Sequence, residues 1–215
     1  MPNRATEAEP IRVSITDAVR RHAKLLPPPE RVEDFGAFFR SLGGASVVLL
    51  GEATHGTHEF YAARAAISRE LVQHHGFNIV AVEADWPDAA RIDRFVRHLE
   101  PDSGAGICFA RFPTWMWRNV EVDQFICWLR AHNENLDRDR RVSFHGLDIY
   151  SLGDSIHAVI SYLDRVDPEA AKIARRRYGC LRPWHEEPAR YGHDVLAGWK
   201  NSCENEVTEE LSDLL

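Results

Sequence analysis

Short, largely apolar runs that each end at an acidic residue recur along the chain. The runs and the acids that end them are 47–51 with Glu52, 78–83 with Glu83, and 142–148 with Asp148. Apolar runs of this length, rich in β-branched residues and bounded by turn residues, are typical of buried strands. The pattern therefore predicts three strands, each with a carboxylate at its carboxyl end.

Segments with helical periodicity separate these runs. The longest extends from about Thr57 to His75, with Thr57 as its cap and Gly76 as its stop. Further helices are predicted at 11–26, at 30–42, from Pro87, around 122–129, at 153–166, at 168–178 and at 203–215. A strand, a helix and a strand in succession predict a right-handed crossover with parallel strands. The predicted fold class is therefore α/β.

Arg64 occupies an unusual position on the 57–75 helix. Together with Phe60, Ile67 and Leu71 it lies on one face, because the spacing is i, i+4, i+7 and i+11. This face should pack on the core, and a guanidinium stays protonated in a protein, so a buried one needs acceptor partners. We expect those partners to be Glu52 or the acid that ends the next strand.

The strand-end acids should gather at one edge of the sheet. The carboxyl ends of parallel strands meet at the same edge, where open α/β sheets bind their ligands. Buried carboxylates that lie close together repel one another, so cations or a metal must balance them. The candidate cations are Arg64, Arg111 and Arg118.

A cluster of aromatic and cationic residues at 111–119 precedes one of the predicted helices. Tryptophans in such a position either cover the sheet edge as packing or line a binding cleft. We select Trp115, Trp117 and Arg118 of this cluster, with Asp148 from the third strand, as candidate substrate-binding residues.

Composition and charge exclude several classes of protein. The chain has 215 residues, of which 44% are hydrophobic and 27% are charged, as in ordinary globular proteins. No apolar run approaches the roughly 20 residues of a membrane-spanning helix, and the amino terminus has no apolar signal region. A formal net charge of −7 argues against nucleic-acid binding. We expect a cytoplasmic protein that binds neither nucleic acid nor membrane.

The four cysteines, Cys108, Cys127, Cys180 and Cys203, are widely spaced and form no Cys-x-x-Cys pair. This spacing argues against a zinc ribbon and against a disulfide framework. We expect four reduced thiols with structural roles.

A hydrolase that activates water is the first interpretation of these residues. His55 lies just beyond the first predicted strand, three positions after Glu52. Imidazole changes charge near neutral pH, which suits a general base. Glu52 or Glu83 would orient the ring, and Arg64 would stabilise negative charge that develops on the substrate. No Gly-x-Ser-x-Gly elbow or other covalent nucleophile is visible.

Two alternatives remain open. A zinc or iron site could be formed by His55, His58, His145, Glu52, Glu83 and Asp148. The two histidines of the first motif lack the spacing of His-Glu-x-x-His, however, and we predict no metal and no cofactor. The other alternative is a module that binds a ligand at this edge without turnover.

Four motifs, in this order, resemble those of the erythromycin esterase-like family. They are Gly51-Glu52-Ala53-Thr54-His55-Gly56, Val82-Glu83-Ala84-Asp85-Trp86, Phe112-Pro113-Thr114-Trp115-Met116-Trp117-Arg118-Asn119 and His145-Gly146-Leu147-Asp148. The resemblance extends over nearly the whole chain. It implies a three-layer α/β fold, with helices on both faces of a mostly parallel central sheet, in a cytoplasmic bacterial enzyme.

The resemblance also implies an activity. The best-known members of the family hydrolyse the macrolactone ester of erythromycin without a metal, using a histidine that activates water, and so confer antibiotic resistance. On this chain the histidine would be His55, with Glu52, Arg64 and Glu83 as its functional neighbours. The implied substrate is a carboxylic ester or macrolactone of small-molecule size.

Members of this family are typically far longer than this chain, and further active-site histidines lie in their second half. The resemblance therefore implies that residues 1–215 form a single α/β domain, the amino-terminal part of a longer fold, with residues 1–10 disordered. A partner chain or a carboxyl-terminal half would complete the site.

Overall fold

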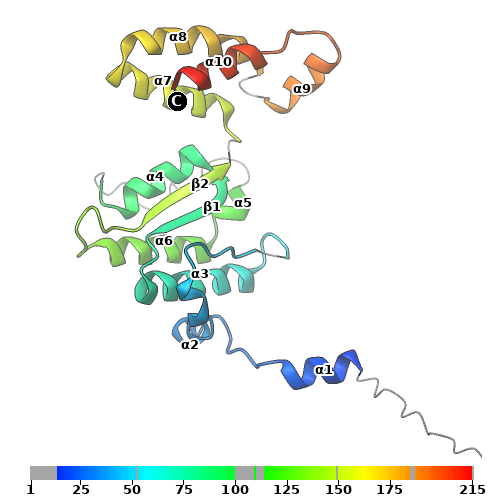
Figure 1. The fold of residues 1–215 in the computed structure, drawn as a ribbon, viewed down its shortest axis with the longest axis vertical. Helices are drawn as coiled ribbons and strands as arrows, with labels where there is room; N and C mark the ends of the chain where they lie inside the picture. The colour runs from blue at the N-terminus through cyan, green and yellow to red at the C-terminus, as the bar shows by residue number, and fades with distance from the viewer. Residues whose placement is uncertain are drawn as a thin grey trace, which may run out of the picture.

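The computed structural model describes residues 14–51, 53–99, 109, 114–148, 150–184 and 187–214. Within these ranges two parallel strands form a small sheet that packs with helices, as Figure 1 shows. The strands are β1 (Ile79–Asp85) and β2 (Ser143–Asp148). The helices are α1 (Ile15–His22), α2 (Val32–Ala37), η1 (Arg40–Gly44), α3 (His58–His75), α4 (Trp86–Val96), α5 (Thr114–Trp117), α6 (Val120–Asn133), α7 (Leu152–Val166), α8 (Pro168–Tyr178), η3 (Gly179–Trp184), α9 (Ala189–Leu196) and α10 (Glu204–Leu214). The protein is thus an α/β protein in which helices predominate.

Strands β1 and β2 are parallel neighbours, as expected for strands joined by a helical crossover. Ile79 pairs with Ser143, and after one shift of register Asp85 pairs with Asp148. The carboxyl ends of the two strands therefore meet at one edge of the sheet, together with the acids that end them.

The strand predicted at residues 47–51 is not formed. This segment is irregular, and Val47 and Leu49 expose 72% and 90% of their surface. Val48 and Leu50 instead pack against a small apolar cluster around Phe35. A cavity is lined by both this segment and β1, and a strand forms only where its backbone pairs with a neighbour. An apolar run was therefore not sufficient to make a third strand.

Helix α3 begins one residue later than predicted and ends where predicted. Thr57 is its N-cap residue, and Gly76 ends it with a φ of +76°. Glycine adopts this left-handed conformation without steric cost, which explains the sharp stop. The helix predicted at 30–42 is instead divided into α2 and η1.

The main core joins the sheet to helices α3, α4 and α6. Phe144 of β2 is 2% exposed and packs with apolar side chains of all three helices. The helical members of this cluster include Val72, Ala89, Ile92, Phe95, Val96, Val122, Phe125, Ile126 and Leu129. Gly146 allows β2 to approach the start of α4, because a Cβ atom there would lie 2.5 Å from the Ala84 carbonyl oxygen and 2.8 Å from Cα of Trp86.

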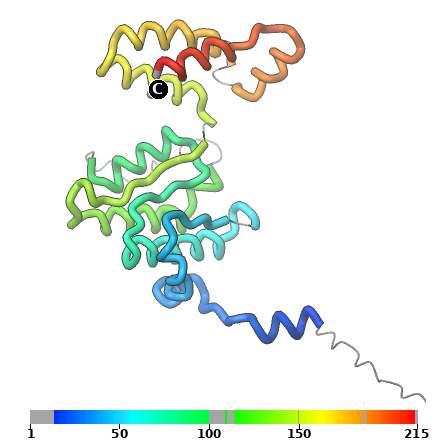
Figure 2. The backbone as a smooth tube through the Cα atoms, in the orientation of Figure 1, coloured from blue at the N-terminus to red at the C-terminus, as the bar shows by residue number. Residues whose placement is uncertain are grey.

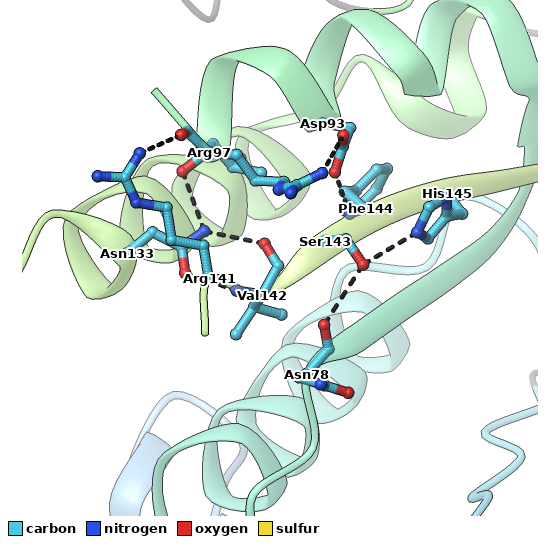
Figure 3. A network of polar contacts seen from close by, with 10 residues as sticks. Asn78, Asp93, Arg97, Asn133, Arg141, Val142, Ser143, Phe144 and His145 are labelled. Carbon is cyan, nitrogen blue, oxygen red and sulfur yellow. Dashed lines mark hydrogen bonds and ion pairs between the residues drawn. The ribbon is translucent and has the colours of Figure 1, made fainter. Parts of the chain in front are cut away.

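Asn133, at the end of α6, connects three elements inside this core (Figure 3). Its side-chain amide donates to the carbonyl oxygens of Val96 at 3.0 Å and Val142 at 2.9 Å, and its Oδ1 accepts from the Val142 N–H at 2.8 Å. Asp93 of α4 accepts a further bond from the Phe144 N–H at 2.9 Å. These bonds satisfy buried polar groups and hold the start of β2 against α4 and α6.

Helices α7 to α10 follow β2 and form a second group of helices, drawn from yellow to red in Figure 2. Helices α7 and α8 pack through Leu163 and Ala171. Helix α10 is held to α8 by Arg177, which lies 3.1 Å from a carboxylate oxygen of Glu210 and 2.6 Å from one of Asp213. Apolar packing and the contacts of the Arg177 guanidinium thus help to hold this group together.

A disulfide joins Cys180 of η3 to Cys203, which precedes α10. The prediction of reduced thiols is wrong for these two residues. Their Cα atoms lie 5.9 Å apart, a separation typical of disulfides, because the chain turns back through α9 over 23 positions. Cys127 lies on α6 with an exposed side chain and is not part of this disulfide. Cys108 lies outside the described residues.

The helix near the amino terminus is shorter than predicted. The predicted disorder of residues 1–10 falls outside the described ranges, and the 11–26 helix is present as the shorter α1. Helices long and apolar enough to cross a bilayer are absent from the described part of the chain.

Candidate active site

A cavity of about 440 Å³ lies among α3, β1, α6 and the irregular segment 48–51. Pockets for small molecules have volumes of about 300–1,000 Å³, so this one is of suitable size. Most of its lining residues are apolar, and they include Leu50, Val72, Val80, Phe125 and Phe144. The polar lining residues include Tyr61, Arg64, Glu83 and Glu121.

His55 lies in the turn that leads into α3 and is not among the described residues that line this cavity. The Gly56 N–H donates to the hydroxyl of Tyr61 at 3.3 Å, and Tyr61 lines the cavity. Gly56 has a φ of +78°, and a Cβ atom there would lie 3.6 Å from the Trp115 ring. The ring of His55 meets Trp115 edge-on, with centroids 6.2 Å apart. Tyr61 and Trp115 thus bound the turn, while His55 itself is exposed.

Arg64 is half-buried at the cavity wall, whereas the sequence pattern predicts a core position. Its guanidinium carbon lies 4.8 Å from the centroid of the Tyr61 ring, a cation–π distance. Ile67 and Leu71, on the same predicted face, are 7% and 4% exposed. The predicted face is therefore correct for the later turns of α3, but the first turns border the cavity. Glu52, the predicted partner of Arg64, lies outside the described residues.

The acids at the strand ends occupy different environments. Glu83 is exposed and lines the cavity, whereas Asp148 is half-buried at the end of β2. The buried acid at this edge is Asp85, 5% exposed, which the sequence analysis did not select. It accepts hydrogen bonds from the N–H of Ser151, at 3.1 Å, and from the hydroxyl of the same residue. Asp85 therefore fixes the turn that follows β2. The sequence signal that could have identified Asp85 as a residue of this edge was its position in the motif, two residues after Glu83.

The aromatic cluster contributes both to packing and to the cavity. Trp117 is 8% exposed, belongs to the main core and lines the cavity. Trp115 is 55% exposed and packs against the turn that carries His55. Arg118 is exposed. Residues 111–113, including the candidate cation Arg111, lie outside the described ranges.

A second histidine, His58, contacts two carboxylates at the start of α3. Its Nδ1 lies 2.5 Å from Oε1 of Glu121, and its Nε2 lies 3.4 Å from a carboxylate oxygen of Glu30. The hydrogen bond to Glu121 raises the pKa of His58. Burial by itself would raise the pKa of Glu121, but the bond from His58, a backbone hydrogen bond and the attraction of the imidazole together lower it. The contact thus favours the charged form of both residues.

The sequence pattern indicated His58 only as a candidate metal ligand and did not indicate Glu121 or Tyr61 as site residues. The contact between His58 and Glu121 joins residues 63 positions apart, so no local spacing indicates it. Tyr61 lies four residues after Thr57, in the first turns of α3. This spacing was the one sequence signal that its hydroxyl could contact the turn before the helix.

The described residues contain no group of three or more His, Cys, Asp or Glu side chains arranged to hold a metal ion. His145, one of the candidate ligands, lies on β2 with its Nε2 2.9 Å from the Ser143 hydroxyl. The arrangement that the structure does describe is an exposed imidazole beside an apolar cavity with a guanidinium and two carboxylates in its wall. Such a site can bind a largely apolar ligand and offer it acid–base groups.

The chain is similar to known proteins of one family. A family model described as erythromycin esterase matches residues 72–215. Erythromycin esterase type II of Escherichia coli is 27% identical over 154 residues, which cover 70% of this chain and 35% of that protein. Erythromycin esterase type I of Escherichia coli is 31% identical over 131 residues, which cover 60% of this chain and 30% of that protein.

A solved structure of a protein from Bacillus cereus has a similar fold. It superposes with a TM-score of 0.61 at 25% identity, covering 77% of this chain and 40% of that one. The chain spans about a third of the length of the curated relatives named above. The family model begins inside α3 and takes in both strands and all later helices, well over half of the sequence. The chain therefore belongs to the erythromycin esterase family.

Proposed function

We propose that this protein is a hydrolase that cleaves a carboxylic ester or macrolactone by attack of water, with His55 as the general base. The observation that carries the proposal is the position of the His55 turn, which the Gly56–Tyr61 hydrogen bond holds beside a cavity with Arg64 and Glu83 in its wall. Membership of the erythromycin esterase family supports hydrolysis as the reaction class. The proposed reaction would use groups of the turn and of the cavity wall.

In the proposed reaction a water oxygen attacks the ester carbonyl carbon and its proton passes to the His55 imidazole. Negative charge develops on the carbonyl oxygen, where the guanidinium of Arg64 stabilises it. The bond from carbon to the alkoxy oxygen then breaks, and the leaving oxygen takes the proton back from the imidazole. The products are a carboxylic acid and an alcohol, or one ring-opened hydroxy acid from a macrolactone. Glu52 and Glu83 would orient the imidazole.

Four residues would contact the substrate. Trp117 lines the cavity and would pack against the apolar part of the ester. Trp115, Arg118 and Asp148 would contact the parts of a larger substrate that extend beyond the cavity. Erythromycin is the macrolactone to test first, because the names of the two relatives from Escherichia coli refer to it.

A further polypeptide segment, from a partner chain or a carboxyl-terminal half, would cover the sheet and complete a three-layer fold. The support is the exposed face of the sheet, where Ile79 and Leu147 expose 60% and 72% of their surface. Register places Glu83 and His145 on this same face. Parallel sheets are normally covered on both faces. We therefore expect another polypeptide segment to pack on this face, which carries both apolar and polar side chains.

The test is hydrolysis of erythromycin and of a panel of p-nitrophenyl esters by the purified chain, with and without EDTA, followed by mass spectrometry. His55→Ala should lower the rate by roughly 10²- to 10⁴-fold. His157→Ala is the matched control, because His157 is an exposed histidine on α7. It should leave the rate unchanged.

Each outcome separates the proposal from its alternatives. Turnover that persists in EDTA and disappears in His55→Ala supports water activation by His55. Turnover that EDTA abolishes favours a metal-dependent hydrolase at the strand ends, and full activity of His55→Ala excludes His55 as the base. Binding of the same esters without cleavage identifies a ligand-binding protein instead.

A further inference from the structure

The contacts of His58 with Glu121 and Glu30 join three segments, two of which, α3 and α6, border the cavity. His58 is the first residue of α3, Glu121 lies in the first turn of α6, and Glu30 precedes α2. The two distances from the imidazole, 2.5 Å to Glu121 and 3.4 Å to Glu30, place one ring between two carboxylates. Neither His58 nor Glu121 has a role in the proposed water attack.

Glu121 differs from the other acids near His58 because it is part of the cavity wall. Its side chain is 18% exposed, whereas that of Glu30 is 54% exposed. Its neighbours in the lining include the apolar side chains of Val122 and Phe125. A carboxylate placed in an apolar wall loses hydration, so it needs hydrogen-bond donors to compensate.

His58 supplies one such donor, but it contacts a single oxygen of the carboxylate. The hydrogen bond joins Nδ1 of His58 to Oε1 of Glu121. An ionised carboxylate can accept about four hydrogen bonds through its two oxygens. With the bond from His58 at Oε1 and one backbone hydrogen bond, the carboxylate still has acceptor sites for a ligand in the cavity, and the bond at Oε1 limits its rotation.

We propose that Glu121 binds a hydrogen-bond donor of the ligand, a hydroxyl or an ammonium group on an otherwise apolar body, and that His58 is the residue that positions Glu121 for this contact. The inference deepens the proposed function, since it names a substrate feature that the same cavity selects. The apolar body would occupy the wall formed by residues such as Val72 and Phe144. The donor would lie against α6.

Three fluorescent probes that differ at one atom group test this inference without any turnover. They are N-pentyl dansylamide, N-(5-hydroxypentyl) dansylamide and dansylcadaverine, which end in a methyl, a hydroxyl and an ammonium group. Dissociation constants are measured from the dansyl emission. The wild-type chain should bind at least one of the two donor probes about tenfold more tightly than the pentyl probe, as expected for one hydrogen bond to a charged acceptor.

The variants assign this preference to the two residues. Glu121→Gln and His58→Ala should lose it while binding the pentyl probe as the wild type does, which also shows that the cavity is intact. His58→Gln keeps a side-chain N–H near Oε1 and should retain part of the preference. Asp123→Asn is the matched control, because it removes a carboxylate from the same turn of α6 at an exposed position.

Equal affinity for all three probes in the wild type would overturn the inference, as would binding of none of them. A preference that survives in Glu121→Gln would assign the donor site to another residue. The hydroxyl and ammonium probes distinguish a neutral donor from a cationic one. Ester hydrolysis is measured separately, so a donor preference without turnover would refute the proposed reaction and leave this inference standing.

Discussion

Nδ1 of His58 lies 2.5 Å from Oε1 of Glu121, although the two residues are 63 positions apart. The contact brings together the amino-terminal ends of α3 and α6, and Glu30 adds a second carboxylate on the other side of the ring. One imidazole therefore connects three segments of the chain, of which α3 and α6 line the cavity. Its protonation state should affect how firmly these segments are held.

The stability of the wild-type protein should depend on pH through this pair. The pKa of His58 is raised from its ordinary value of 6.5 by the hydrogen bond to Glu121, with smaller contributions from Glu30 and Glu59. A raised pKa stabilises the fold fully below the unfolded value, and this stabilisation is lost as the pH rises through the folded value. The pKa of Glu121 is lowered from 4.5, so its contribution is lost as the pH falls through the folded value. The pair should therefore stabilise the fold most between about pH 4.5 and 6.5.

Melting temperatures of the wild type and of Glu121→Gln, measured across this range, check the prediction. The difference between the two should be largest at about pH 5.5 and should shrink as the pH rises above the folded pKa of His58. In NMR titrations the pKa of His58 should move toward its ordinary value in Glu121→Gln. The Asp123→Asn variant keeps the contact between His58 and Glu121 and should follow the wild-type curve. A pH-independent difference would show that His58 is not the titrating group.

Gly146→Ala should destabilise the protein by about 1–3 kcal/mol, the cost of overpacking a filled interior. A Cβ atom at Gly146 would lie 2.5 Å from the Ala84 carbonyl oxygen and 2.9 Å from Cβ of Ala89. The backbone of β1 and of α4 would have to move. Gly179→Ala is the control, because nothing lies within 4 Å of a Cβ atom there. Denaturant unfolding monitored by circular dichroism measures both changes, and equal midpoints would mean that α4 can shift freely.

The elements that depend on local signals could be predicted from the sequence. Helix α3 has a cap, a regular apolar face and a glycine stop, and all three signals act within one or two turns. Helix α8 begins at Pro168 and ends at Tyr178 as predicted. The strands predicted at 78–83 and 142–148 form as β1 and β2, whereas the predicted β-α-β pairing of residues 47–51 with 78–83 does not.

The features that were missed depend on partners distant in sequence. Residues 47–51 have the composition of a strand, but a strand also needs a paired neighbour, and the cavity lies between this segment and β1. The helix face that carries Arg64 was predicted correctly. How deeply the Arg64 side chain is buried depends on how closely residues 48–51 pack against α3, which the sequence pattern does not indicate. The pairs His58–Glu121 and Cys180–Cys203 arise only when the chain turns back on itself.

Loss of the disulfide should destabilise the group of helices from α7 to α10. The bond closes a loop over 23 positions, and loops of this size contribute about 3 kcal/mol when they are cross-linked. Cys203→Ser should therefore lower the melting temperature of this group, with far-ultraviolet circular dichroism as the readout. Cys127→Ser is the matched control, since Cys127 is exposed and lies outside the 180–203 loop that the disulfide closes. In thiol titration of the unfolded, unreduced chain, neither Cys180 nor Cys203 should react. Four reactive thiols would contradict the bond.

Arg64→Ala should reduce activity far more than stability. The guanidinium is half-buried, and its cation–π contact with Tyr61 contributes about 0.5–1 kcal/mol, less than a fully buried ion pair would. In the proposed reaction it also stabilises the carbonyl oxygen, and loss of such a group lowers kcat by about 10²- to 10³-fold.

Arg69→Ala separates the two effects of Arg64. Arg69 lies on the same helix, and its guanidinium carbon is 4.9 Å from the Trp128 ring, compared with 4.8 Å between Arg64 and Tyr61. It is not among the residues that line the cavity within the described part of the chain. The two variants should therefore unfold at similar denaturant concentrations, while only Arg64→Ala loses ester hydrolysis. Equal loss of hydrolysis in both would mean that Arg64 acts through the stability of α3, and the assignment of this guanidinium to the developing negative charge would be wrong.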